Sequence, residues 1–138
     1  RPSAEKEFDY KFRIAKAFYY LNKFKQSILE VEEILKKTLS QEQNFSVRLF
    51  RANVLLIKKD FAEAMEEFEK LLVEFPERAQ KENLGLVVAV AYEDMNEFDK
   101  AITTLEKIKS NADDPNFIEI KIKRLKERIA NQPGKKKK

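Results

Sequence analysis

FAEAMEEFEKLLVEFP, residues 61–76, is the stretch that decides the fold, because related stretches begin 37 residues before it and 37 residues after it. Phe24, Phe61 and Phe98 begin the three copies. In each copy a small residue follows three positions later, and larger apolar residues follow at the fourth, seventh and tenth positions. This is the spacing of one face of an α-helix. The chain therefore contains three copies of one amphipathic helix.

A second segment precedes each copy and repeats in the same register. Its small positions are Ala15, Ala52 and Ala89, and its large positions are Phe18, Leu55 and Tyr92. The two segments are separated by polar pairs that are typical of turns, namely Asn22-Lys23, Lys59-Asp60 and Asn96-Glu97. Each unit is therefore predicted to be a helix–turn–helix.

The three units resemble the tetratricopeptide repeat (TPR) family, in which paired helices carry small, aromatic and proline residues at set positions. The matching residues of the middle unit are Ala52, Leu55, Phe61, Ala64, Phe68 and Pro76. The resemblance covers residues 8–115. It departs from the family in its spacing of 37 rather than about 34 residues, in lacking the tryptophan and glycine of the first helix, and in having Leu55 in place of an aromatic residue.

The resemblance implies an all-α fold of the α/α superhelical, or solenoid, type. Three TPR-like units are expected at about 8–40, 45–76 and 82–113, followed by a C-terminal capping helix at about 115–131. Residues 1–131 are predicted to form a single domain of about seven helices, frayed over residues 1–7. Residues 132–138 are predicted to be a disordered lysine tail.

Local signals place two helix starts. Ser40 stands three residues before Gln43, which is the spacing of a capping box. Asp114 precedes Pro115 in the manner of an N-cap followed by proline at the first helical position. These signals predict helices that begin near residues 41 and 115.

Residues 77–95 are predicted to form one helix that opens the third unit. The run LGLVVAVAY within it would also suit a buried strand, but Gly85, Ala89 and Tyr92 fall in the repeat register and favour the helix. Because Gly85 and Ala89 lie four residues apart, we expect this helix to approach its neighbour closely.

Composition excludes several classes of function. The chain has no histidine and no cysteine, so it has neither a disulfide nor a thiolate metal site, and we predict a non-enzymatic protein without cofactors. The net charge of +4 belongs to the four lysines of residues 135–138, and the remaining 24 basic and 24 acidic residues balance. Because the rest of the chain is neutral, binding to nucleic acid or to a membrane surface is expected only of the lysine tail. No apolar run is long enough to span a bilayer, so a soluble protein is predicted, with the cytoplasm slightly favoured.

Acidic residues are interpreted as partners of nearby lysines on solvated helix faces. The predicted pairs are Glu32 with Lys36, Glu33 with Lys37, and Glu66 with Lys70.

In TPR-like arrays the first helix of each unit lines a groove that holds a partner peptide or helix, and the resemblance implies such a groove here. The residues at the matching positions, most of them apolar or aromatic, are Phe12, Lys16, Tyr19, Tyr20, Leu49, Phe50, Asn53, Leu56, Ile57, Asn83, Leu86, Val87, Val90 and Glu93. An apolar groove favours an amphipathic helix or peptide of another protein as the partner. The chain is thus predicted to be an interaction adaptor or scaffold.

Two alternatives stay open at this point. The groove residues could pack against one another within the chain. They could also form a homodimer, through the groove or through the apolar stripe Ile118, Ile122, Leu125 and Ile129 of the last helix.

Overall fold

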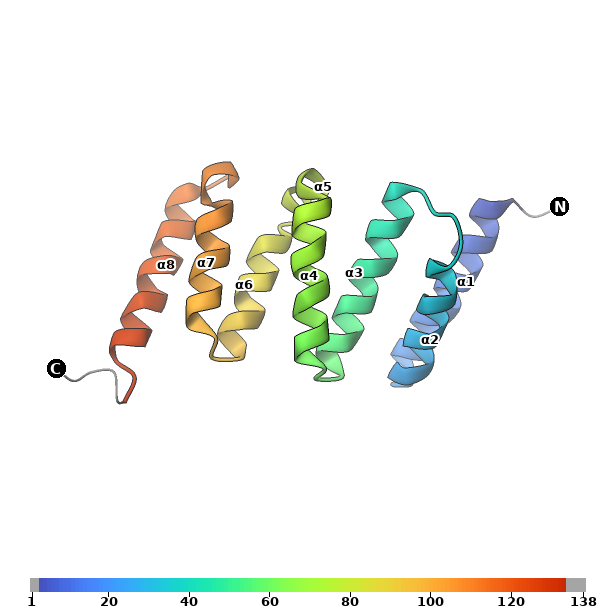
Figure 1. Ribbon diagram of the computed structural model, residues 1–138, viewed down its shortest axis with the longest axis horizontal. Coiled ribbons are helices and arrows are strands. Elements are labelled where there is room, and N and C mark those ends of the chain that lie inside the picture. Colours follow the sequence, from blue (N-terminus) through green and yellow to red (C-terminus); the bar gives the residue numbers. More distant parts are fainter. Residues whose placement is uncertain (1–2, 134–138) are drawn as a thin grey trace. The chain divides into compact units, whose positions relative to one another are not determined.

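The computed structural model describes residues 3–133 and is built from α-helices (Figure 1). Within this range it contains eight α-helices, one 3-10 turn and no strand, so the predicted all-α fold class is confirmed. The chain divides into two compact units, which are larger than the repeated helix pairs. They are called the first unit (Arg1–Glu74) and the second unit (Phe75–Lys138). A single domain over residues 1–131 stays a prediction. The predicted lysine tail lies largely outside the described residues. No described helix is both long enough and apolar enough to cross a membrane.

The first unit consists of two helix pairs, with α1 packed on α2 and α3 packed on α4. Its helices are α1 (Ala4–Tyr20), α2 (Phe24–Leu35), α3 (Gln41–Ile57) and α4 (Phe61–Glu74). α2 also contacts α3, which joins the two pairs into one core. The expectation of a frayed segment is wrong over residues 4–7, because α1 already begins at Ala4, whereas residues 1 and 2 lie outside the described residues. The hydroxyl of Ser3 caps α1 by accepting a hydrogen bond from the backbone N–H of Lys6 at 3.1 Å.

The second unit contains the third helix pair and the closing helix. Its elements are α5 (Pro76–Lys81), α6 (Leu84–Asp94), α7 (Phe98–Ile108), the 3-10 turn η1 (Lys109–Asn111) and α8 (Pro115–Ala130). α6 packs on α7, and α7 packs on α8. The predicted start of the closing helix is confirmed, because a carboxylate oxygen of Asp114 accepts a hydrogen bond from the N–H of Phe117 at 3.2 Å.

The prediction of one helix over residues 77–95 is wrong. The structure has two helices there, α5 and α6, and the break lies at Asn83, whose φ of 55° is left-handed. Asparagine tolerates this conformation better than most residues. The helical alternative for the run LGLVVAVAY is nevertheless confirmed over a strand, because α6 covers that run.

The repeated small residues of the helix pairs belong to the core. All six side chains at these positions are buried, and they are Ala15 and Ser27, Ala52 and Ala64, and Ala89 and Ala101. In the first pair Ser27 donates its hydroxyl proton to the backbone carbonyl of Ala15 at 2.8 Å, which satisfies the one buried hydroxyl of this set. A larger side chain at any of these positions would overpack the core.

Gly85 allows α6 to approach α7 closely. A Cβ atom at this position would lie 2.7 Å from Cγ2 of Ile108 on α7, which is too short for two carbon atoms. The expectation that Gly85 allows a close approach of two helices is therefore confirmed.

The turn inside each helix pair has the same backbone structure. Asn22, Lys59 and Asn96 all adopt a left-handed conformation, with φ of 61°, 71° and 61°. In each turn the following residue donates its N–H to the carbonyl five residues earlier, as Lys23 does to Phe18 at 2.8 Å. This is the Schellman arrangement that ends helices. The predicted polar turns thus have a defined geometry.

Candidate interaction surface

Aromatic residues predicted to line a groove hold the first unit together. Phe12 is buried in the core of this unit, and its ring lies 5.5 Å, edge-on, from that of Phe50 on α3. The ring of Tyr19 lies 5.8 Å from Phe50 and 5.8 Å from Phe24 on α2. Edge-to-face rings at these distances attract one another. These three predicted groove residues therefore contribute to packing between α1, α2 and α3.

Other predicted groove residues of the first unit remain open to solvent. Tyr20, Asn53 and Ile57 are exposed, and Leu49 and Leu56 are half-buried. Lys16 is exposed and places its ammonium group 4.2 Å from the centre of the Phe12 ring, so it covers one face of that ring. The first unit thus offers a smaller apolar surface than the sequence predicts.

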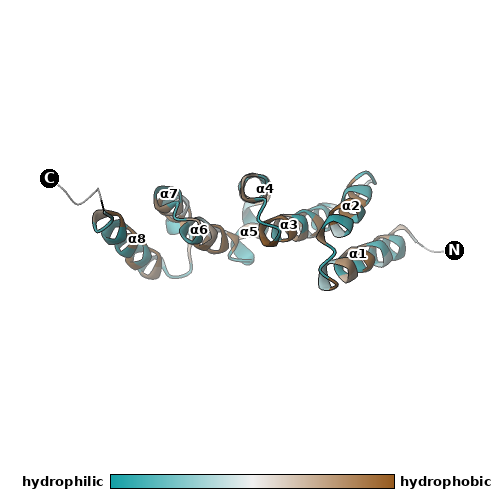
Figure 2. Ribbon diagram, turned by 90° about the horizontal axis from the view of Figure 1, so that it is seen from below, coloured by the Kyte–Doolittle hydropathy of each residue, from teal (hydrophilic) through white to brown (hydrophobic). Residues whose placement is uncertain are grey.

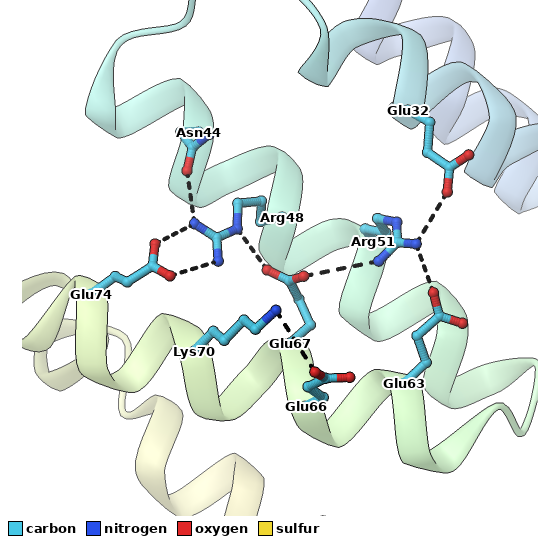
Figure 3. A network of polar contacts seen from close by, with 9 residues as sticks. All are labelled: Glu32, Asn44, Arg48, Arg51, Glu63, Glu66, Glu67, Lys70 and Glu74. Carbon is cyan, nitrogen blue, oxygen red and sulfur yellow. Dashed lines mark hydrogen bonds and ion pairs between the residues drawn. The ribbon is translucent and has the colours of Figure 1, made fainter.

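An ion-pair network on α3 was missed by the sequence analysis (Figure 3). The guanidinium of Arg48 donates to Glu67 at 2.6 Å and to Glu74 at 2.6 Å and 3.3 Å, and also to the side-chain oxygen of Asn44 at 3.1 Å. Because Glu67 and Glu74 lie on α4, Arg48 ties α3 to its paired helix.

Arg51, one turn further along α3, extends the network to a third helix. It donates to Glu63 on α4 at 2.8 Å and to Glu32 on α2 at 3.1 Å. The predicted pairs are therefore partly wrong. Glu32 pairs with Arg51, and Glu33 pairs with Lys36 at 3.0 Å, while the Glu66–Lys70 pair is present at 3.8 Å. A signal was available in the spacing of Arg48 and Arg51, which puts two cations on one helix face.

The network shifts the proton affinities of its members. Hydrogen bonds from Arg48 lower the pKa of Glu74, and the same contact raises the pKa of Arg48. Burial disfavours the charged form of Arg51 and by itself would lower its pKa. The hydrogen bonds to Glu63 and Glu32 outweigh this effect of burial, so the pKa of Arg51 is raised. These shifts stabilise the charged forms, as expected for a structural network. Among residues 3–133 no group of three or more acidic side chains is arranged to hold a metal ion.

The second unit presents an apolar helix face. α6 is apolar on nearly all sides, and it buries Leu84, Val88 and Ala91. On the side that remains, Val87 and Val90 are 45% and 42% exposed, and Leu86 beside them is half-buried. These two valines lie one turn apart and belong to the predicted groove positions. Asn83 is exposed at the start of the same helix.

The last helix covers α7 and reaches back to α6. Of the predicted apolar stripe, Ile118, Ile122 and Leu125 are buried and Ile129 is half-buried, and a homodimer stays a prediction. The guanidinium of Arg128 donates to Glu93 on α6 at 2.8 Å and lies 4.6 Å from the centre of the Phe98 ring. Glu93, a predicted groove residue, is therefore an internal partner of α8.

Comparison with known proteins supports a helical-repeat assignment for both units. A protein-family model described as "Tetratricopeptide repeat protein 21 ARM repeat" matches residues 9–126. A comparison with curated proteins found no match. The family match confirms the predicted relationship to TPR proteins, and stacked helical repeats of this kind are built to present binding surfaces to other proteins. The chain has three repeated helix pairs, and the family model matches most of its length. It therefore belongs to the family of tetratricopeptide repeat protein 21 ARM repeats.

Proposed function

We propose that this chain is a scaffold module that binds a peptide or amphipathic helix of another protein. The binding surface is formed by the exposed faces of the first helix of each repeated pair. The observation that carries the proposal is the outer face of α6. Val87 and Val90 stay nearly half exposed there, on a helix that buries Leu84, Val88 and Ala91 on another side. Apolar side chains that a fold leaves together in solvent mark contact sites for other molecules.

The free energies of burial and of binding indicate how large the interface must be. Covering two half-exposed valines stabilises a complex by about 2 kcal/mol. A micromolar complex needs about 8 kcal/mol. Val87 and Val90 are therefore the centre of a larger interface, to which Leu86 and neighbouring side chains must also contribute. In the first unit, the exposed residues among the predicted groove positions are Lys16, Tyr20, Asn53 and Ile57, and of these Lys16 and Asn53 correspond to Val90 in the repeat register.

The proposal is tested with the double variant Val87→Asp/Val90→Asp. The chain is immobilised and incubated with lysate of its source, and proteins that remain bound are identified by mass spectrometry. We expect the native chain to retain a small set of proteins and the double variant to lose it. A photo-crosslinking residue at position 87 should then form a covalent product with one of those proteins.

The matched control is Val73→Asp, since Val73 is also a valine on a helix and is 78% exposed, but lies outside the predicted face. It should retain the same proteins as the native chain. Circular dichroism is measured on both variants, and we expect both to stay helical. If the double variant retains the full set and position 87 gives no product, partner binding does not use this face and the proposal is wrong.

A further inference from the structure

One of the buried rows of α6 recurs in α8. A shift of 34 residues places the buried Leu84, Val88 and Ala91 on the buried Ile118, Ile122 and Leu125. The same shift places the predicted binding positions Asn83, Leu86, Val87 and Val90 on Phe117, Ile120, Lys121 and Arg124. α8 therefore carries, on one face, a second row of residues equivalent to the binding face of α6.

The two helices that carry these rows lie in one compact unit. Figure 2 shows α6 and α8 on the same side of α7. The ion pair of Arg128 with Glu93, at 2.8 Å, joins the last turn of α8 to the last turn of α6. Both helices therefore run in the same direction with their C-terminal ends adjacent. A segment that covers Val87 and Val90 can continue onto α8.

The chemistry of the second row differs from that of the first. Phe117 and Ile120 are 48% and 49% exposed, so the row keeps an apolar part. Lys121 and Arg124 complete it at helical spacing, and within residues 3–133 neither forms an ion pair. Lys121 places its ammonium group 5.9 Å from the centre of the Phe117 ring. This face of α8 is thus apolar and cationic, with two charges that form no ion pair within residues 3–133.

We infer that the partner segment is an acidic amphipathic peptide, whose apolar residues cover Val87, Val90 and Ile120 and whose carboxylates meet Lys121 and Arg124. This inference rests on the function proposed above and adds the sign of the partner's charge. A carboxylate that approaches both cations gains attraction and loses little solvation, because all three groups stay near the surface. Complementary charge also selects against basic segments that offer the same apolar residues.

Other occupants fit this face less well. A helix that lies in a membrane interface inserts a broad apolar face, whereas the apolar face of α8 is buried against α7 and only Phe117 and Ile120 remain. A second copy of the chain, paired symmetrically through this row, would place Lys121 and Arg124 close to the same cations of its partner.

The test selects peptides from a displayed library of random sequences on the full chain, its Lys121→Glu/Arg124→Glu variant and its Val87→Asp/Val90→Asp variant. The matched control is Lys123→Glu/Lys126→Glu, which makes the same change in net charge on other sides of α8. We expect the native chain and the control to enrich peptides that combine acidic and large apolar residues. By fluorescence anisotropy, an enriched peptide should bind the Lys121/Arg124 variant on the order of tenfold more weakly.

Each outcome separates the inference from the function on which it rests. Peptides that lack acidic residues, are lost with Val87→Asp/Val90→Asp and are kept by Lys121→Glu/Arg124→Glu would overturn the inference and leave the proposed function intact. Peptides indifferent to both variants would overturn both. Binding to vesicles that contain phosphatidylserine but not to neutral vesicles, lost in the Lys121/Arg124 variant, would assign the face to a membrane instead. Lys121→Gln/Arg124→Gln removes charge without reversing it and should give an intermediate loss of peptide affinity. That outcome would show that charge is the cause.

Discussion

Asn22, Lys59 and Asn96 occupy the same left-handed position in the three turns between paired helices. At the end of a helix this position favours glycine, and asparagine is the next best residue, because a Cβ atom crowds the backbone there. Lysine has neither advantage. The middle turn therefore stores backbone strain that the other two turns largely avoid.

Replacing Lys59 with glycine should stabilise the protein by about 0.5–1 kcal/mol, because it removes the cost of a left-handed lysine. Urea unfolding followed by circular dichroism measures the change. Lys25→Gly is the matched control, since Lys25 is an exposed lysine inside α2, where the backbone is helical. That change should destabilise the protein, because glycine gains entropy in the unfolded chain. A gain in stability from both substitutions would contradict the explanation.

Glu74 is the member of the arginine network that should respond to acid. Its pKa is lowered from 4.5 by the hydrogen bonds from Arg48, so it stabilises the fold above the unfolded pKa and loses this effect as the pH falls through the lower, folded value. Glu74→Gln should cost at most about 1 kcal/mol near neutral pH, because the glutamate side chain is half exposed. The cost should shrink progressively below pH 4.5.

The measurement is the free energy of unfolding of native and variant chains over a series of pH values. Glu66→Gln on the same helix serves as a control, because Glu66 makes only an exposed ion pair with Lys70 at 3.8 Å. It should change stability little at any pH. A cost for Glu74→Gln that stays constant with pH would show that the glutamate acts through packing and not through charge.

Two kinds of contact hold α3 between its neighbours at the scale of helices. On one side, Phe50 inserts its ring between those of Phe12 and Tyr19 on α1. On the other, Arg48 and Arg51 bridge to α4, and Arg51 also reaches α2. A helix with apolar residues on nearly every side needs cover on both sides, and this combination provides it. Phe50 is therefore a packing residue of the first unit.

Phe50→Ala should lower the free energy of unfolding by about 2 kcal/mol, since it removes two ring contacts and leaves a cavity in a half-buried site. Tyr20→Ala, at a predicted groove position that is 77% exposed, should cost less than about 1 kcal/mol. Chemical denaturation of the two variants makes the comparison. Equal costs would indicate that Phe50 is not required for packing and is available to a partner.

Charge is distributed unevenly at the scale of the whole molecule. The net charge of +4 equals the four lysines of residues 135–138, and 24 basic and 24 acidic residues remain without them. These lysines lie outside the described residues. Within the second unit, a local excess of positive charge remains on α8, where Lys121 and Arg124 are unpaired among residues 3–133.

Deleting residues 135–138 should therefore leave partner capture unchanged at physiological salt, although it brings the net charge to zero. The reason is that the proposed contacts lie on α6 and α8. The check compares captured proteins for the full chain and the truncated chain by quantitative mass spectrometry. Loss of capture on deletion, together with full capture by Val87→Asp/Val90→Asp, would instead identify a charge-driven binder of acidic surfaces.

Sequence periodicity predicted most of the fold. The aligned small residues, such as Ala15 and Ala52, set the repeat register, and all of them are buried. The capping box at Ser40 and Gln43 predicted the start of α3, and both of its hydrogen bonds are present, at 3.0 Å and 3.1 Å. The break at Asn83 was not predicted, because a left-handed asparagine interrupts a helix without leaving any trace in the apolar spacing.

The candidate surface could be predicted only in part. Val87, Val90 and Tyr20 are exposed at the predicted positions, whereas Phe12 is buried and Phe50 packs on α1. Spacing along a helix shows which side chains share a face, but it does not show whether another helix covers that face.

By itself, the sequence determined the number and order of the repeated helix pairs, their turns and the small residues of their register, because these depend on residues close together in the chain. Only the tertiary structure decided which apolar faces are covered and which charges are neutralised. Phe12 meets Phe50, Arg48 meets Glu74 and Arg128 meets Glu93 across 38, 26 and 35 residues. No local pattern encodes such pairings, because they arise only when helices pack against one another.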